Sequence, residues 1–272
     1  NPHGDERPVL LVVSQGHAGL LMPALNADSS RKVTDLPFYP WADADGPEAQ
    51  LKALLADAGA LGRPGLRVAL DETMRADFAL LVLGMLPDVT HSFTAETVGA
   101  LRARKDDEEY RLLKMNALIN DRAMQAAFRA LRPGVTENAA EGARPEFISV
   151  CFGENGAFPH HYSSDRVLRA DDMILIDIGG RKAGYPSDMT RVATIGAPDQ
   201  EFELVHAVLE RAVQAAVDAA RPGVPAKAVD AAARDIIAAA GYGDRFLHRT
   251  GHGVGIDIHE PPYITSTSER LL

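Results

Sequence analysis

Short apolar runs alternate with amphipathic segments over the first hundred residues. The runs at 9–13 and 67–70 predict strands, 20–25 is a second apolar segment, and the apolar spacing at 48–58 and 78–86 predicts helices. Strands that alternate with helices are typical of a small α/β domain, which we expect to end near Gly99. Three isolated histidines in this region are interpreted as structural residues: His3, His17 and His91.

A long helix is predicted from Asp106 to the Pro133-Gly134 pair that ends it. Acidic residues fill its first turn at 106–109, and Arg129 and Arg132 lie near its end. This order of charges complements the helix dipole. The acidic run is therefore interpreted as helix electrostatics and not as a metal site.

Residues 123–135 repeat at 212–224, with nine of thirteen positions identical and a shared Arg-Pro-Gly-Val end. Such a duplication predicts two similar half-domains that face each other across a cleft. A helix at 228–240 follows the second copy, whereas only 136–141 follow the first copy before a Gly-Ala-Arg-Pro sequence. We therefore expect a segment to be missing after Glu141.

Residues 173–178 are almost entirely apolar with Asp177 set inside the run, and a second apolar run at 189–195 follows Asp188 directly. Glycine-rich residues 179–184 separate the runs, so the sequence predicts a hairpin of buried strands. If the turn centres near Lys182 and Ala183, the two carboxylates face each other, with Cβ atoms about 4.5–5.5 Å apart. Facing carboxylates repel unless a cation lies between them, which favours a metal site. The alternative is two aspartates that cap turns.

Three histidines fall within twelve residues of one another, interleaved with glycines: His248, His252 and His259. Glycine permits the close backbone approach and the unusual φ values that a crowded site requires. This grouping favours a functional site over three unrelated structural histidines.

The composition narrows the class of protein. A formal net charge of −10 argues against a surface for nucleic acid or for anionic membranes. The single cysteine, Cys151, fits a reducing compartment, so we expect a cytoplasmic protein. No apolar run approaches the ~20 residues that a membrane-spanning helix needs. The sequence does not begin with methionine, and we expect the original chain to start earlier.

Five motifs, in this order and spacing, resemble the pita-bread metallopeptidases, and within them the Xaa-Pro peptidases, prolidase and aminopeptidase P. They are Pro159-His160-His161-Tyr162, the strand at 172–179, the hairpin end at 184–191, Gly251-His252-Gly253-Val254-Gly255 and His259-Glu260-Pro261-Pro262. The resemblance implies an N-terminal creatinase- or prolidase-like α/β domain at 1–99. It also implies a pita-bread α+β catalytic domain at 100–272 with an internal pseudo-twofold repeat.

The same resemblance implies a site with two metal ions. Asp177 would be a bidentate ligand of one ion, Asp188 would bridge both, and His252 would be the imidazole ligand. His160, His248 and His259 match the histidines that surround the substrate without binding metal. The family also uses two glutamates that we expect beyond Leu272, because Glu260 and Glu269 do not match those motifs. These 272 residues are therefore predicted to lack the C-terminal part of the domain and to be inactive alone.

Carboxylates with one imidazole and no thiolate suit Mn²⁺ or Co²⁺ best, with Zn²⁺ or Fe²⁺ as further possibilities. Two such ions can activate a water molecule and polarise a scissile carbonyl. The resemblance thus implies an Xaa-Pro dipeptidase that acts on proline-containing dipeptides, and a homodimer. Three alternatives stay open: an aminopeptidase on longer peptides, the metal-free creatine amidinohydrolase branch, and a non-catalytic binding protein on the same fold.

Overall fold

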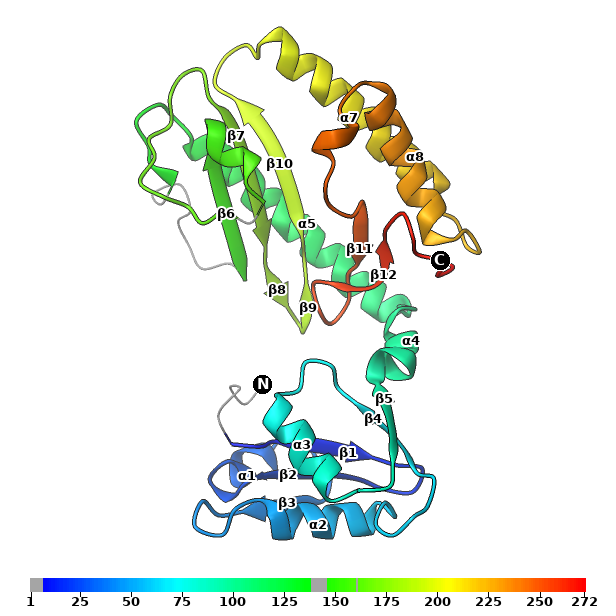
Figure 1. Ribbon diagram of the computed structural model, residues 1–272. Helices are drawn as coiled ribbons and strands as arrows, with labels where there is room; N and C mark the ends of the chain where they lie inside the picture. Colours follow the sequence, from blue (N-terminus) through cyan, green and yellow to red (C-terminus); the bar gives the residue numbers. More distant parts are fainter. Residues whose placement is uncertain (1–6, 138–145, 160) are drawn as a thin grey trace. The chain divides into compact units, whose positions relative to one another are not determined.

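The computed structural model describes residues 7–137, 146–159 and 161–272. The chain divides into two units, Asn1–Gly99 and Ala100–Leu272 (Figure 1). His160 and the segment around Glu141 lie outside the described residues, so the expectations for them are not addressed by the structure. Within the described part of the chain, no helix is both long and apolar enough to cross a membrane.

The first unit is a small α/β unit, as its alternating pattern predicted. Strands β1 (Leu10–Val13), β2 (Ala18–Pro23) and β3 (Phe38–Trp41) form one sheet, in which β1 is antiparallel and β3 parallel to β2. Strand β4 (Arg67–Leu70) lies parallel to β5 (Thr90–Phe93). The helices are α1 (Ala24–Ser30), α2 (Glu48–Asp57) and α3 (Ala76–Gly84).

The core of this unit forms where α2 packs on the first sheet, because Leu51 and Leu54 of the helix and Leu21 of β2 are fully buried. The apolar segment predicted at 20–25 is shared between β2 and the start of α1. A 3-10 turn (Thr94–Glu96) and helix α4 (Val98–Arg102) follow β5. His17 contacts the Tyr39 hydroxyl with its Nε2 atom, at 3.1 Å, which agrees with a structural role.

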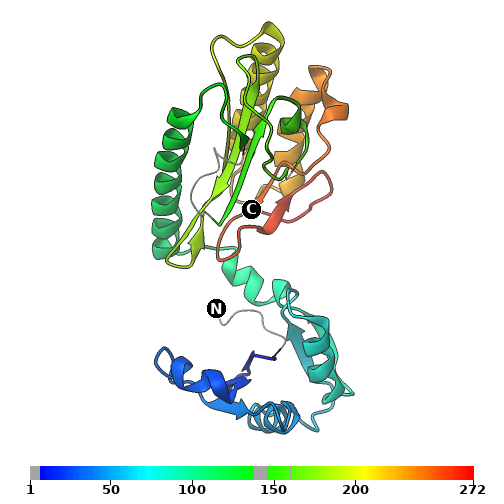
Figure 2. The ribbon, with the colours of Figure 1, turned by 90° about the vertical axis from the view of Figure 1, so that its left-hand side faces the viewer.

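The second unit begins with the long helix α5 (Asp107–Ala130). Asp106 caps it in a capping box, since its carboxylate accepts the Glu109 N–H and the Glu109 carboxylate accepts the Asp106 N–H. The acidic run is therefore a helix start, as predicted. The helix lies along a three-stranded antiparallel sheet of β6 (Phe147–Phe152), β7 (Met173–Gly179) and β10 (Met189–Thr194) (Figures 1 and 2).

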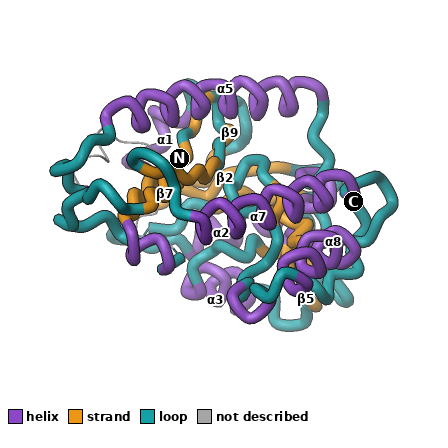
Figure 3. The backbone as a smooth tube through the Cα atoms, turned by 90° about the horizontal axis from the view of Figure 1, so that it is seen from above, coloured by secondary structure: helices purple, strands orange, loops and turns teal. Residues whose placement is uncertain are grey.

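Alternation along β7 decides which side of this sheet is the core. Ile174, Ile176 and Ile178 are buried and pack with Met124 of α5, whereas the intervening residues, Asp177 among them, are half-buried on the other face. Figure 3 shows α5 running over the sheet. The near-continuous apolar run predicted a buried strand. In the structure, β7 is buried on one face and half-buried on the face that carries Asp177, because side chains alternate between the faces of a strand.

The hairpin between β7 and β10 also differs from the predicted register. Asp177 pairs with Thr190, and the short strands β8 (Arg181–Lys182) and β9 (Tyr185–Pro186) keep the same register to the turn. A two-residue turn at Ala183 (φ 53°) and Gly184 (φ 84°) closes the hairpin. Positive φ at both positions gives a tight turn whose twist matches the strands. The predicted pairing of Asp177 with Asp188 is therefore wrong by two residues.

A 3-10 turn at Gly153–Ala157 connects β6 towards β7, and the remaining elements follow β10. Helices α7 (Gln200–Ala219) and α8 (Ala226–Ala239) pack side by side, with Ala212, Ala233 and Ile237 buried between them (Figure 1). A 3-10 turn (Gly243–Arg245) leads to β11 (Gly251–Gly253), which pairs antiparallel with β12 (Glu260–Ile264).

The internal repeat has the same backbone hydrogen bonds in both copies. In the first copy Gly134 N–H donates to Leu168 O and Leu168 N–H donates to Val135 O; in the second, Gly223 N–H donates to Leu272 O and Leu272 N–H donates to Val224 O. One step further along, Glu137 N–H donates to Arg166 O and Ala226 N–H donates to Arg270 O. The duplication seen in the sequence thus continues into a returning segment that pairs with each Arg-Pro-Gly-Val turn.

Candidate metal centre

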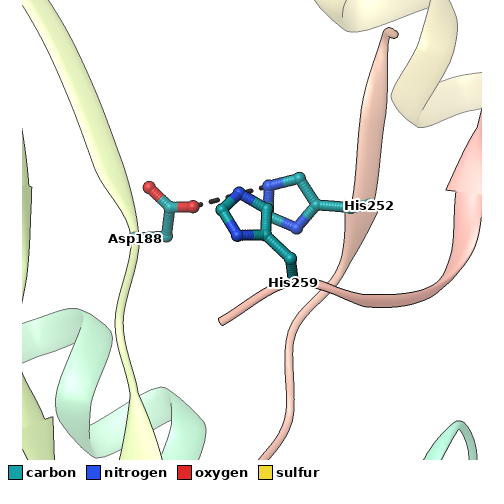
Figure 4. Close-up of side chains that lie close together, drawn as sticks. All are labelled: Asp188, His252 and His259. Atoms are coloured by element: carbon teal, nitrogen blue, oxygen red, sulfur yellow. Dashed lines mark ion pairs between the residues drawn. The ribbon is translucent and has the colours of Figure 1, made fainter. Parts of the chain in front are cut away.

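Three potential metal ligands converge in the second unit: Asp188, His252 and His259. One ligand atom from each lies within 4.8 Å of the others (Figure 4). Asp188 precedes β10, His252 is the middle residue of β11, and His259 immediately precedes β12. The His252 Nε2 atom is 3.5 Å from Asp188 Oδ2, and the two imidazole rings are 4.3 Å apart. The first repeated half therefore contributes the Asp188 carboxylate to the cluster, and the second half contributes the imidazoles of His252 and His259.

The hydrogen bond of His252 fixes which nitrogen faces Asp188. Its Nδ1 atom lies 3.0 Å from the Gly253 carbonyl oxygen, which can only accept, so Nδ1 carries a proton. In the neutral ring, Nε2 then presents a lone pair to a carboxylate oxygen. Such a contact is repulsive unless a proton or a metal ion lies between the two atoms.

Electrostatics around Asp188 point the same way. Burial, followed by the negative charge of Asp177, raises the pKa of the Asp188 carboxyl, and the charges of His252 and His259 lower it only in part. The side chain is 25% exposed. The surroundings of Asp188 therefore disfavour its charged form, and a bound cation would favour that form.

Asp177 lies beside this cluster and is not one of its three members. With the observed register it is a diagonal neighbour of Asp188 on the same face, at a spacing typically about 7–8 Å between Cα atoms. Its Oδ1 atom accepts a 2.7 Å hydrogen bond from the Thr190 hydroxyl, which orients the carboxylate. The two aspartates thus share a face without the direct opposition that the sequence suggested.

His248 lies four residues before His252 and outside the cluster. Its Nδ1 atom is 2.8 Å from the Arg249 carbonyl oxygen, and its ring meets the edge of Phe246 at 4.9 Å. Together with Arg234 of α8 and with residues that precede β11 and follow β12, it lines a shallow cavity of about 300 Å³, whose walls are Arg234, Leu247, His248, Arg249, Thr265 and Ser266.

A buried ion pair on α8 holds the backbone that leads into β11. Asp230 is fully buried and accepts two hydrogen bonds from Arg234 and one from the Thr250 hydroxyl. The Arg234 guanidinium also donates to the carbonyl oxygens of Phe246 and His248. These bonds hold the segment around His248, because the Arg234 guanidinium links α8 to two of its carbonyl oxygens and Asp230 links α8 to Thr250.

The carboxylate of Glu260 has a structural role and is not available to bind a metal ion. Its buried carboxylate accepts hydrogen bonds from Arg102 and Lys105 and from the Asp257 backbone N–H. Burial alone would raise the pKa of Glu260, but these hydrogen bonds outweigh it and lower the pKa. A Cβ atom at Gly255 would lie 2.3 Å from a Glu260 oxygen, so a larger residue there would displace the Glu260 carboxylate. Glu269 is exposed and pairs with Lys227.

Sequence reasoning missed Glu137, which is fully buried in the first half of this unit. Its carboxylate accepts hydrogen bonds from Phe152 N–H, from Asn155, and from both the N–H and the hydroxyl of Ser164, and it contacts His161 Nε2 at 3.2 Å. The signal was weak, because Glu137 stands outside every periodic element and its partners are distant in sequence.

Two asparagines on α5 were missed as well, although their spacing is visible in the sequence. Asn116 and Asn120 lie four residues apart on the buried face of the helix. Asn116 donates to the carbonyl oxygens of Lys182 and Tyr185, and Asn120 donates to that of Ile178. They hold the hairpin that presents Asp188, and polar residues on an otherwise apolar helix face could have indicated this.

The donor set fits a divalent metal ion. Ligand atoms on one ion, each about 2.1 Å from it, lie ~3–4 Å apart, which the 3.5 Å between His252 Nε2 and Asp188 Oδ2 satisfies. Imidazole and carboxylate ligands without thiolate suit Mn²⁺, Co²⁺, Fe²⁺ or Zn²⁺. Asp188 lies in the first repeated half, and His252 and His259 lie in the second, so each half supplies candidate ligands.

An α/β protein that gathers carboxylate and imidazole ligands between two repeated halves has the design of a metal-dependent hydrolase. The chain belongs to metallopeptidase family M24, whose sequence model matches residues 111–272. The resemblance seen in the motifs is thereby confirmed.

Individual relatives agree with this family. The chain is 36% identical to a probable dipeptidase PepE of Mycobacterium tuberculosis, over 97% of this chain and 72% of that protein. It is 30% identical to an Xaa-Pro dipeptidase of Pyrococcus furiosus, over 96% and 76% of the two chains. A crystal structure of prolidase from Thermococcus sibiricus superposes with a TM-score of 0.90 at 30% identity, covering 100% of this chain and 77% of that one.

Proposed function

We propose that this chain is the ligand-bearing part of a metal-dependent dipeptidase that hydrolyses Xaa-Pro bonds. The observation that carries the proposal is the convergence of Asp188, His252 and His259 in a member of a metallopeptidase family. Relatives named Xaa-Pro dipeptidase and dipeptidase support the substrate class. The retained pair of aspartates argues against a metal-free branch of the fold.

Within this proposal, Asp177, Asp188 and His252 would hold the metal, and Asp188 is the ligand that two ions would share. Bound Mn²⁺ or Co²⁺ would supply the activation of a water molecule and the polarisation of the scissile carbonyl. Thr190 orients the Asp177 carboxylate, and the Gly253 carbonyl orients the His252 ring. Partners of this kind keep ligands in position and typically affect metal affinity about 10–100-fold.

His259 and His248 serve the substrate. His259 lies next to His252 and is exposed, so its ring can donate a hydrogen bond to the developing oxyanion. His248 is held by backbone bonds at the edge of the small cavity and would contact the substrate there. His160, outside the described residues, is proposed for the proline side of the substrate.

The proposal is tested by measuring hydrolysis of Gly-Pro and Ala-Pro by the complete product of the gene that encodes these residues. Asp188→Ala should abolish Mn²⁺-dependent hydrolysis and lower bound metal by elemental analysis, while the circular-dichroism spectrum stays unchanged. Ordinary turnover without Asp188 would contradict the assignment. Cleavage of longer Xaa-Pro peptides, faster than of dipeptides, would identify an aminopeptidase instead.

Metal stoichiometry tests the proposal of two ions. Hard divalent metal ions take about six ligands. Glu260 and Glu269 are already paired with basic side chains, Arg102 and Lys227 respectively. We therefore expect the 272 residues alone to bind Mn²⁺ weakly, with at most one ion and no hydrolysis above background. Two tightly bound ions on these residues would show that our ligand count is too low.

A further inference from the structure

The loop that carries His259 is tied to the hairpin that carries Asp188 by one arginine. Arg181, on β8, donates from Nη1 to the Gly184 carbonyl oxygen at 2.8 Å and to the Ile256 carbonyl oxygen at 2.6 Å. Gly184 belongs to the turn of the hairpin, and Ile256 lies midway between His252 and His259. A single nitrogen thus bridges the two parts of the chain that supply the cluster.

The rest of the guanidinium is fixed by Glu146. Nε and Nη2 of Arg181 donate to the two carboxylate oxygens of Glu146, at 2.8 and 2.7 Å. Glu146 is itself anchored, because its N–H donates to the carbonyl oxygen of Gly179 at the end of β7. The planar fork of a bidentate pair sets the direction in which Nη1 points. The anchor of the bridge is therefore the sheet itself.

The geometry points to Arg181 as a positioning residue for the proposed metal centre, an inference that rests on the proposed function. Asp188 is four residues beyond Gly184, and the nearest ligand atoms of Asp188 and His252 are 3.5 Å apart. Ligand geometry is sensitive to shifts well below that distance. By holding Ile256 against the hairpin, Arg181 keeps His252 and His259 within reach of Asp188. A lysine could not do this, because it cannot engage Glu146 and two carbonyl groups in one plane.

The bond to Ile256 contributes more to geometry than to global stability. Arg181 and Glu146 are each about one-third exposed, at 35% and 33%, and Ile256 is exposed as well. Water can therefore satisfy the carbonyl oxygens when the guanidinium is removed. We expect Arg181→Met to fold, with a looser loop at 254–259.

The first measurement is amide hydrogen exchange of the metal-free protein, which does not depend on activity. Gly255 N–H is bonded to Asp257 O and Asp257 N–H to Glu260, so both amides report on the loop. Arg181→Met should speed their exchange. The matched control is Arg111→Met, which removes an equally bidentate arginine pair, with Glu108, on exposed α5 and no bond to the loop. Unchanged loop exchange in Arg181→Met, or equal effects in both variants, would overturn the inference.

The second measurement separates positioning from charge. Glu146→Gln removes the counter-charge of Arg181 and one of the two oxygens that orient its guanidinium, but leaves Nη1 able to donate to the carbonyl oxygens of Gly184 and Ile256. In the complete gene product, Arg181→Met should weaken Mn²⁺ binding about tenfold, as loss of an orienting partner does, and lower kcat with KM nearly unchanged. Glu146→Gln should have a smaller effect, and Arg181→Lys an effect close to that of Arg181→Met. Equal losses for Glu146→Gln and Arg181→Met would mean that only the ion pair matters. If the wild-type protein binds no Mn²⁺, the proposed function fails, while hydrogen exchange still decides the role of Arg181.

Discussion

Replacement of Glu137 by glutamine tests how much one buried carboxylate contributes to the second unit. Glu137 is 0% exposed. Burial alone would raise its pKa, but hydrogen bonds from Ser164, Asn155, Phe152 and His161 lower the pKa from 4.5 to about 2. A shift of that size corresponds to about 3 kcal/mol of folding free energy at neutral pH, at about 1.4 kcal/mol per pH unit. In Glu137→Gln the amide NH₂ replaces one accepting oxygen and faces donors, so most of this stabilisation should be lost.

The sign of the pH dependence follows from the lowered pKa. Because the unfolded carboxylate has the higher pKa, the contribution of Glu137 is fully present above about pH 4.5 and is lost as the pH falls towards 2. The difference in unfolding free energy between wild type and Glu137→Gln should therefore be about 3 kcal/mol at pH 7 and shrink steadily below pH 4.5.

Urea unfolding followed by circular dichroism measures this difference. The single tryptophan, Trp41, lies in the first unit, so a transition without a change in its fluorescence belongs to the second unit. Glu154→Gln is the control, since Glu154 is a neighbouring carboxylate that is 71% exposed. A difference between wild type and Glu137→Gln that stays constant from pH 7 to pH 2 would refute the reasoning.

Three further substitutions probe the surroundings of the metal centre. His259→Ala should cost on the order of 10²-fold in kcat with metal content nearly unchanged, and a collapse of metal binding would make His259 a ligand. Asp230→Asn should cost about 3 kcal/mol and disturb the His248 segment, because Arg234 loses its buried partner; denaturation and hydrogen exchange at 246–250 measure this. Asn120→Leu should cost about 1–3 kcal/mol by leaving the Ile178 carbonyl without its donor, which urea unfolding of the second unit detects; no loss of stability would show that Asn120 is dispensable.

The sequence predicted those features that depend on local pattern. Asp106 and Glu109 indicated the start of α5, and the structure has the capping box between them. Alternating runs indicated the α/β character of the first unit. The glycine-interleaved histidines were expected to gather at a site, and two of them, His252 and His259, lie with Asp188.

Features that depend on distant contacts were not predictable in this way. The register of the hairpin follows from the conformation of Ala183 and Gly184, and a glycine-rich loop is compatible with more than one turn. Asp230 and Arg234 are spaced like an ordinary surface pair on a helix, and only the packing of α8 shows that Asp230 is buried. Arg181 lies in a turn sequence whose partners are up to 75 residues away.

The matching hydrogen bonds of the two repeats show how a duplicated unit can divide its tasks. At equivalent positions after the Arg-Pro-Gly-Val turn, the first copy has Glu137 and the second has Ala226, and both are completely buried. The Glu137 carboxylate accepts hydrogen bonds from Phe152, Asn155 and Ser164, whereas Ala226 is the first residue of helix α8. The backbone frame tolerated this change because its own hydrogen bonds do not involve either side chain. On this shared backbone frame the first half carries Asp188, and the second half carries His252 and His259.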